Sequence, residues 1–96
     1  MTRILIVDDE KNIRRTFGMV LSGEGFEVSE AESGEAALEI LASDPPDLMV
    51  LDVKLPGIDG LEVLRRTRAD HANLPAVLVS GPRTIATAVA ATRAGP

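Results

Sequence analysis

The sequence contains no cysteine and a single histidine, His71. Without cysteine there can be no disulfide, no thiolate metal site and no cysteine nucleophile. Zinc sites are built mainly from cysteine and histidine, so one histidine also argues against zinc. His71 falls in a loop expected between a helix and a strand, and we assign it no role. A metal site in this chain would therefore be built from oxygen ligands.

Positive charge is also scarce, because 10 Lys and Arg residues stand against 15 Asp and Glu, a net charge of −5. Nucleic acids and anionic membranes require a positive protein surface, so we expect neither as a direct partner. Long apolar runs are missing as well: Ile4–Val7 is followed at once by two aspartates, too short a run for a signal peptide or a membrane span. We expect a cytoplasmic protein.

The 96 residues, 45% hydrophobic and 26% charged, are typical of one globular domain. Short apolar runs that predict buried strands recur along it: Ile4–Val7, Leu48–Leu51 and Ala76–Val79. Phe26–Ala31, which shows some alternation, predicts a strand nearer an edge of the sheet. A helical segment follows each run. This alternation predicts an α/β fold with a doubly wound parallel sheet and right-handed crossovers.

The expected helices have apolar residues at helical spacing. The first has Ile13, Phe17, Val20 and Leu21 on one face, an aspartate cap and acid in its first turn, and ends at Gly23 and Gly25. A second predicted helix is capped by Ser33 and buries Ala37, Leu38 and Leu41. A third has Leu61 and Leu64 facing inward, and a last helix, Ile85–Arg93, is capped by Thr84.

The stretch from Leu48 to Gly60 organises the chain. Its apolar run stops at one carboxylate, Asp52, and Pro56-Gly57 then supplies a turn before the next helix. Asp52 is thus predicted at the carboxyl end of a central strand, where open α/β sheets bind their ligands. The alternative is that Asp52 only accepts hydrogen bonds from loop amides.

Polar residues follow three of the predicted strands: Asp8-Asp9, Asp52 and Ser80-Gly81. If the first and third strands are neighbours, three carboxylates converge, and their repulsion raises a pKa unless a cation lies between them. Oxygen ligands favour Mg²⁺, which beside a carboxylate suits phosphoryl transfer onto that carboxylate. Ser80 would donate a hydrogen bond to the phosphate, and Gly81 would leave room for it. Taken singly, Asp8-Asp9 could be a helix cap and Ser80 a turn residue.

Three segments, Ile4–Glu10, Pro46–Gly60 and Leu78–Gly81, resemble the receiver domains of two-component response regulators. The resemblance covers the whole chain, because the motifs occur in order at receiver spacing. It implies a three-layer flavodoxin-like fold with strand order 2-1-3-4. The stretch from Ser80 to Val89 further resembles receivers of nitrogen-regulation-type transcriptional activators.

The resemblance also implies residue roles. Asp52 would be the phosphoacceptor, receiving its phosphate from a sensor histidine kinase, and Asp9 would bind Mg²⁺ directly and Asp8 through water. Asp52 and the backbone carbonyl of Lys54 would be further metal ligands. Ser80 would be the switch hydroxyl, with Gly81 and Pro82 beside the phosphate. The domain would be a phosphoacceptor switch rather than a turnover enzyme, controlling an output domain in transcriptional regulation.

Receivers have a fifth strand, a Lys-Pro pair and a fifth helix where this sequence ends at Ala94–Pro96. The phosphate-pairing lysine and the aromatic switch residue are therefore absent, and neither Lys11 nor Lys54 has the motif position to replace the lysine. We expect residues 1–96 to be a receiver domain incomplete at its carboxyl terminus, a fragment of a longer regulator. Its last strand, Ala76–Val79, is then an open edge through which we expect self-association.

Two other functions are compatible with these residues. One is a receiver-like protein-interaction module that is never phosphorylated. The other is a phosphatase or dehalogenase with an aspartyl nucleophile on the first strand. The adjacency of Asp8 and Asp9 argues against the second, because such enzymes resemble a pattern with one residue between the two aspartates.

Overall fold

The computed structural model describes residues 1–79. Its strands are β1 (Arg3–Val7), β2 (Glu27–Ala31), β3 (Leu48–Asp52) and β4 (Ala76–Val79), and its helices are α1 (Lys11–Gly23), α2 (Gly34–Ser43) and α3 (Gly60–Asp70). The predicted site residues Ser80, Gly81 and Pro82 and the predicted helix Ile85–Arg93 lie outside the described residues.

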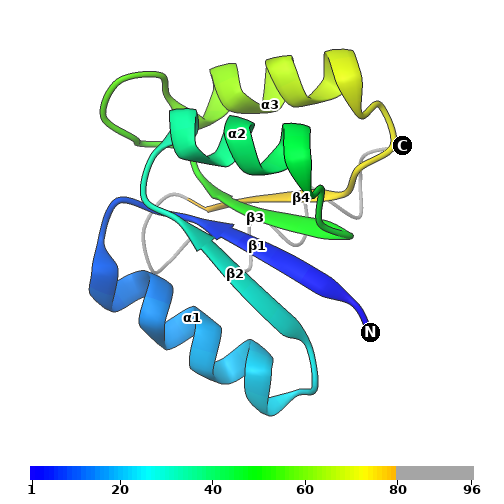
Figure 1. Ribbon diagram of the computed structural model, residues 1–96. Coiled ribbons are helices and arrows are strands. Elements are labelled where there is room, and N and C mark those ends of the chain that lie inside the picture. Colours follow the sequence, from blue (N-terminus) through cyan, green and yellow to red (C-terminus); the bar gives the residue numbers. More distant parts are fainter. Residues whose placement is uncertain (80–96) are drawn as a thin grey trace.

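The four strands form one parallel sheet in the order β2-β1-β3-β4, as expected (Figure 1). Helix α1 covers one face of this sheet, and α2 and α3 lie together on the other. The described part of the chain is therefore a three-layer α/β domain. Strand β1 lies between β2 and β3, which places the end of β1 beside the end of β3.

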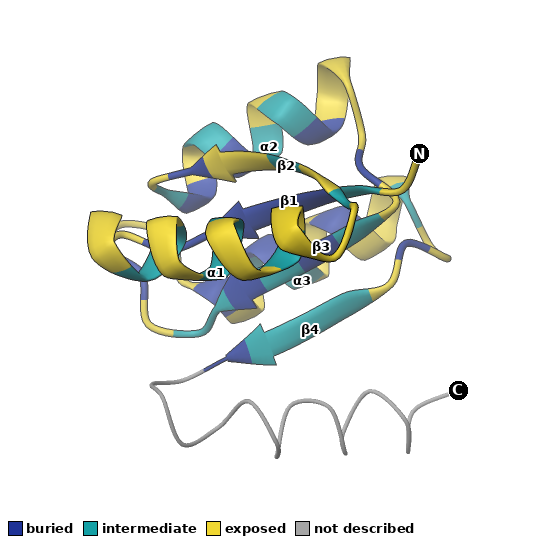
Figure 2. Cartoon of the chain, turned by 90° about the horizontal axis from the view of Figure 1, so that it is seen from below, coloured by how far each residue is buried: buried dark blue, intermediate teal, exposed yellow. Residues whose placement is uncertain are grey.

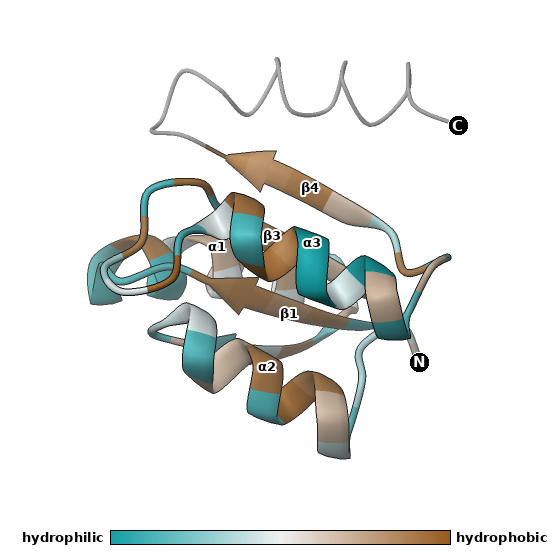
Figure 3. Ribbon diagram, turned by 90° about the horizontal axis from the view of Figure 1, so that it is seen from above, coloured by the Kyte–Doolittle hydropathy of each residue, from teal (hydrophilic) through white to brown (hydrophobic). Residues whose placement is uncertain are grey.

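The core is centred on β1, whose last four residues are almost completely buried (Figure 2). Figure 3 shows the same strand as hydrophobic over most of its length. Strand β3 differs: Met49 and Leu51 are fully buried in the core shared with α2 and α3, whereas Leu48 and Val50 are half-buried. The continuous apolar run Leu48–Leu51 favours a strand buried on both faces, whereas β3 is fully buried on one face and half-buried on the other.

Helix α2 forms as its sequence predicts. The Ser33 hydroxyl oxygen accepts a hydrogen bond from the Ala36 N–H at 3.1 Å, which caps the helix. Ala37 and Leu41 are buried, and Leu38 packs against the core.

Helix α3 is rotated relative to its prediction. Leu61 was expected to face inward but is 55% exposed, whereas Val63 and Thr67 are buried and Leu64 packs against the core. Gly60 lies directly against the end of β3, and residues three and seven positions further along the helix share its face. Thr67 is buried without penalty because its hydroxyl donates to the Val63 carbonyl at 2.7 Å.

Helix α1 differs from its prediction at its start and in which residues face the sheet. Its N-cap residue is Glu10, and within residues 1–79 no side chain caps it and no acid lies in its first turn. The Asp8 carboxylate instead accepts a hydrogen bond from the Glu10 N–H, in the turn that leads into the helix. Val20 was expected on the buried face but is 60% exposed. The helix ends at Gly23 as expected, and Gly25 adopts a left-handed φ of 94° before β2.

Candidate metal and phosphoacceptor site

Three aspartates meet where β1 and β3 end. Val7 pairs with Leu51, so the next residue on each strand, Asp8 and Asp52, lies at the same edge of the sheet. One carboxylate oxygen from each of Asp8, Asp9 and Asp52 lies within 4.8 Å of the others. The structure thus brings together the three carboxylates that the sequence placed at strand ends.

Asp8 is held at three points. Its backbone N–H donates to the Ala31 carbonyl at 3.1 Å, its Oδ1 accepts from the Glu10 N–H at 2.8 Å, and its own carbonyl accepts from Arg14 Nη1 at 2.7 Å. The residue is only 7% exposed. A nearly buried carboxylate fixed in this way is preorganised as a ligand rather than free to move into solvent.

Asp52 is positioned by the loop that follows β3. Its Oδ1 accepts a hydrogen bond from the Lys54 backbone N–H at 3.0 Å, and the Lys54 side chain is exposed. Gly57 gives this loop a left-handed φ of 74°. The hydrogen bond and the Gly57 conformation turn the chain sharply after β3. Because Oδ1 accepts the Lys54 N–H, Oδ2 is the oxygen of Asp52 that stays available at the edge of the sheet.

Gly60 allows the start of α3 to approach the end of β3. A Cβ on Gly60 would lie 2.1 Å from the Asp52 carbonyl oxygen and 2.8 Å from Val53 Cα. Its N–H donates to the Val53 carbonyl at 2.9 Å. The absence of a side chain at Gly60 is therefore part of how Asp52 is positioned.

The electrostatics follow from this crowding. Burial raises the pKa of the Asp52 carboxyl above its ordinary value, and the negative charges of Asp8, Asp9 and Glu10 raise it further. The hydrogen bond from the Lys54 N–H opposes these effects. A cation among the carboxylates would remove the repulsion, since opposite charge favours the ionised form.

The donor set fits a hard divalent cation. Three carboxylates with neither histidine nor cysteine among them are the oxygen ligands that Mg²⁺ and Ca²⁺ prefer, and Mg²⁺ needs only one or two carboxylates with water. The acidic cluster could therefore hold a metal ion.

Two residues near the site were missed by the sequence analysis. Gly60 was interpreted only as the start of a helix, although an Asp-Gly pair after a turn is compatible with close backbone approach. Arg14 was not singled out, and its signal is an arginine between Ile13 and Phe17 on the inward face of an amphipathic helix.

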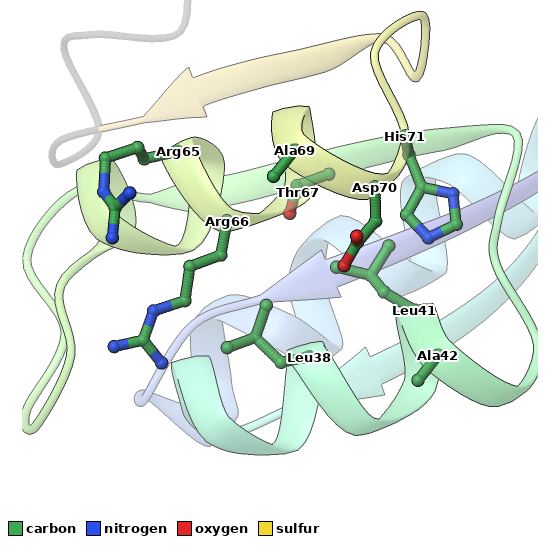
Figure 4. A pocket seen from close by; sticks show the side chains of 9 residues that line it. All are labelled: Leu38, Leu41, Ala42, Arg65, Arg66, Thr67, Ala69, Asp70 and His71. Carbon is green, nitrogen blue, oxygen red and sulfur yellow. The ribbon is translucent and has the colours of Figure 1, made fainter.

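A shallow pocket of about 330 Å³ lies between α2 and α3, away from this chemistry (Figure 4). Leu38 and Leu41 line it from α2, and Arg66 and His71 from α3 and its C-cap. None of the three clustered aspartates lines it. His71 is half-buried here. Within residues 1–79, no helix has the length and apolar character needed to cross a membrane.

Known proteins resemble the chain over nearly its full length. A family model described as the response regulator receiver domain matches residues 4–96. Response regulator MprA of Mycolicibacterium vanbaalenii is 41% identical over 93 residues, which cover 97% of this chain and 40% of MprA. The chain thus spans less than half the length of the curated relative it matches.

Solved structures resemble it similarly. NtrX from Brucella abortus superimposes with a TM-score of 0.81 at 41% identity, covering 99% of this chain and 22% of NtrX. TrrA of Thermotoga maritima, crystallised in complex with histidine kinase ThkA, gives a TM-score of 0.80 at 43% identity, covering 84% of this chain and 70% of TrrA. TrrA in complex with Mg²⁺ and BeF gives a TM-score of 0.76 at 37% identity, covering 96% of this chain and 81% of TrrA.

These matches confirm the family predicted from the three sequence motifs, and this chain belongs to the receiver domain family of two-component response regulators.

Proposed function

We propose that the chain accepts a phosphoryl group on Asp52 from a sensor histidine kinase, with Mg²⁺ bound beside it, and so controls an output domain. The observation that carries the proposal is the convergence of three carboxylates within 4.8 Å at the ends of β1 and β3. The TrrA structures support it, because that relative is seen with a histidine kinase and with Mg²⁺ and BeF.

In this proposal the metal ligands are Asp9 directly, Asp8 through water, Asp52 and the backbone carbonyl of Lys54. When bound, Mg²⁺ neutralises charge on the oxygens of the transferred group. The chain's own contribution is to fix the ligands: Asp8 is held by three hydrogen bonds, and Asp52 by the Lys54 N–H.

The reacting atom on this chain is Asp52 Oδ2. Oδ1 accepts the Lys54 N–H, whereas among the described residues no hydrogen bond is recorded for Oδ2. Oδ2 attacks phosphorus, the bond from phosphorus to the donor histidine nitrogen breaks, and that nitrogen keeps the electron pair. The product is an acyl phosphate on Asp52.

Ser80 would donate its hydroxyl hydrogen to the phosphoryl group, and Gly81 and Pro82 would flank it. These three roles rest on the family motif alone, because the residues lie outside the part of the chain that the structure describes. Residues 1–96 would act as a cytoplasmic receiver domain and a phosphorylated switch rather than a turnover enzyme, within a regulator of transcription. Self-association through the β4 edge stays a prediction.

The test is phosphorylation by acetyl phosphate with Mg²⁺, followed by intact-protein mass spectrometry. The parent should gain one phosphoryl group, and Asp52→Asn or chelation of Mg²⁺ should abolish the gain. Asp70→Asn is the matched control, because Asp70 is an exposed carboxylate outside the cluster and should leave labelling unchanged.

Three results would contradict the proposal. An unlabelled parent that still binds protein partners would identify an interaction module without phosphorylation. Sustained release of phosphate from a phosphoester would identify an aspartyl phosphatase. Labelling that survives in Asp52→Asn would place the nucleophile elsewhere.

A further inference from the structure

Arg14 connects three elements next to the acidic cluster. It lies in the first turns of α1, and its Nη1 donates to the backbone carbonyl of Asp8, the residue after β1, at 2.7 Å. Its Nε donates to Glu30 Oε1, on β2, at 3.0 Å. The Arg14 side chain is 12% exposed, so solvent competes little for these contacts.

The carbonyl that Arg14 contacts belongs to the peptide that joins Asp8 to Asp9. A peptide unit is planar, so its oxygen cannot be held in place without also restricting the two α-carbons on either side. Each of those α-carbons carries one of the clustered carboxylates. A hydrogen bond at this oxygen therefore sets how the two carboxylates are presented to a cation.

The bond matters most for Asp9. Asp8 has two further anchors, in its backbone N–H and its Oδ1, whereas Asp9 is exposed and has no hydrogen bond recorded among the described residues. The geometry of Asp9 thus depends on the peptide on its amino side. That peptide is the one fixed by Arg14.

Glu30 in turn orients Arg14. The guanidinium has its N–H groups in a rigid fork, so occupying Nε with Glu30 directs Nη1 at the Asp8 carbonyl. The negative charge of Glu30 also balances that of Arg14. The pair therefore acts on the acidic cluster through position rather than through added positive charge.

We propose that Arg14 is a positioning residue for the metal site, fixing the peptide between Asp8 and Asp9, and that Glu30 acts through Arg14. This inference rests on the proposed function, because it requires that the acidic cluster bind a cation. It predicts that metal affinity depends on a side chain that touches neither the metal nor the phosphate.

The test is Mg²⁺ binding by isothermal titration calorimetry, together with urea denaturation at a series of Mg²⁺ concentrations. The increase of unfolding free energy with Mg²⁺ concentration gives Kd independently of the stability of the metal-free protein. Arg14→Gln should weaken Mg²⁺ binding roughly 10-fold, the lower end of the range typical for residues that orient metal ligands. Arg15→Gln removes the same charge from the next, exposed position and should leave Kd unchanged.

Three more variants test how Arg14 and Glu30 act together. Arg14→Lys has no fork to span both partners and should fall between the parent and Arg14→Gln. Glu30→Ala should weaken binding by a smaller factor than Arg14→Gln, and the double variant should bind as Arg14→Gln alone does, because Glu30 acts only through Arg14. If Arg14→Gln does not fold without metal, Arg14→Lys and Glu30→Ala carry the test.

The outcomes separate this inference from the proposed function. If the parent binds Mg²⁺ and the Arg14 and Glu30 variants lose stability at unchanged Kd, Arg14 is only a structural residue and the inference is wrong. Additive effects of the two substitutions would overturn the role of Glu30. If the parent itself fails to bind Mg²⁺, the proposed function fails instead.

Discussion

Replacing Gly60 with alanine tests how tightly α3 is held against the end of β3. The new Cβ would lie 2.1 Å from the Asp52 carbonyl oxygen, 2.8 Å from Val53 Cα and 2.9 Å from the Asp52 carbonyl carbon. All three obstacles are backbone atoms, which cannot move aside by changing rotamer. The start of α3 must move away, which weakens the 2.9 Å hydrogen bond from the Gly60 N–H to the Val53 carbonyl.

We expect Gly60→Ala to lower the free energy of unfolding by about 1–3 kcal/mol, the usual cost of forcing extra volume into a packed site. Alanine is the better helix former, but at the first position of α3 this preference offsets only part of that cost. For a domain of this size each kcal/mol lowers Tm by roughly 4–8 °C. Urea denaturation with Mg²⁺ chelated measures the change directly.

Gly18→Ala is the matched control. Gly18 lies inside α1, and a Cβ there would meet Val28 Cγ1 at 3.8 Å, an ordinary van der Waals contact. The same substitution should therefore raise stability by about 0.5–1 kcal/mol, the difference between glycine and alanine within a helix. If the two variants shift stability in the same direction, the close approach of Gly60 to β3 is wrong.

Three further predictions concern charge. Burial and neighbouring carboxylates raise the pKa of Asp52 above 3.8, so stability falls as pH rises above 3.8, and the full loss is reached above the raised pKa. Asp52→Asn should therefore raise Tm at pH 7 in chelator and lose this advantage below pH 3.8. Mg²⁺ at 100 times its Kd should add about 2.7 kcal/mol to the unfolding free energy of the parent. Asp9→Asn should lose most of this gain. An unchanged melting curve of the parent in Mg²⁺ would contradict the metal site. Hydrogen bonds from Arg65 and Arg66 lower the pKa of Glu62 from 4.5 to about 2, so its contribution is complete above pH 4.5 and lost as pH falls toward 2. Glu62→Gln should therefore be less stable than the parent at neutral pH and low salt, and a deficit that persists at pH 2 would refute this reasoning.

Local sequence determined the elements themselves. Short apolar runs bounded by turn residues favour strands buried in a sheet, and the strands at Ile4, Leu48 and Ala76 form where those runs lie. Helix α2 also follows from local chemistry, because Ser33 caps it and Ala37 and Leu41 face one side. The aspartates at strand ends were equally readable, since parallel strands place all their carboxyl ends at one edge.

Tertiary structure decided which parts meet. Only the placement of β1 beside β3 brings Asp8 and Asp9 to Asp52, because the two segments are some forty residues apart and nothing local joins them. The rotation of α3 was likewise set from outside the helix, by the contact of Gly60 with the β3 backbone. The sequence pattern predicted that Leu61 rather than Thr67 faces the core, because hydrophobicity alone carries no information about that contact.

The same reason explains Arg14. In the sequence, helical spacing places Arg14 nearer the inward face than Arg15, but it does not reveal which groups Arg14 contacts. In the fold, β2 brings Glu30 and β1 brings the Asp8 carbonyl to its guanidinium, while Arg15 stays exposed. The sequence specifies the donors and acceptors of each side chain. A hydrogen bond between distant segments forms only when packing brings its donor and acceptor within about 3 Å.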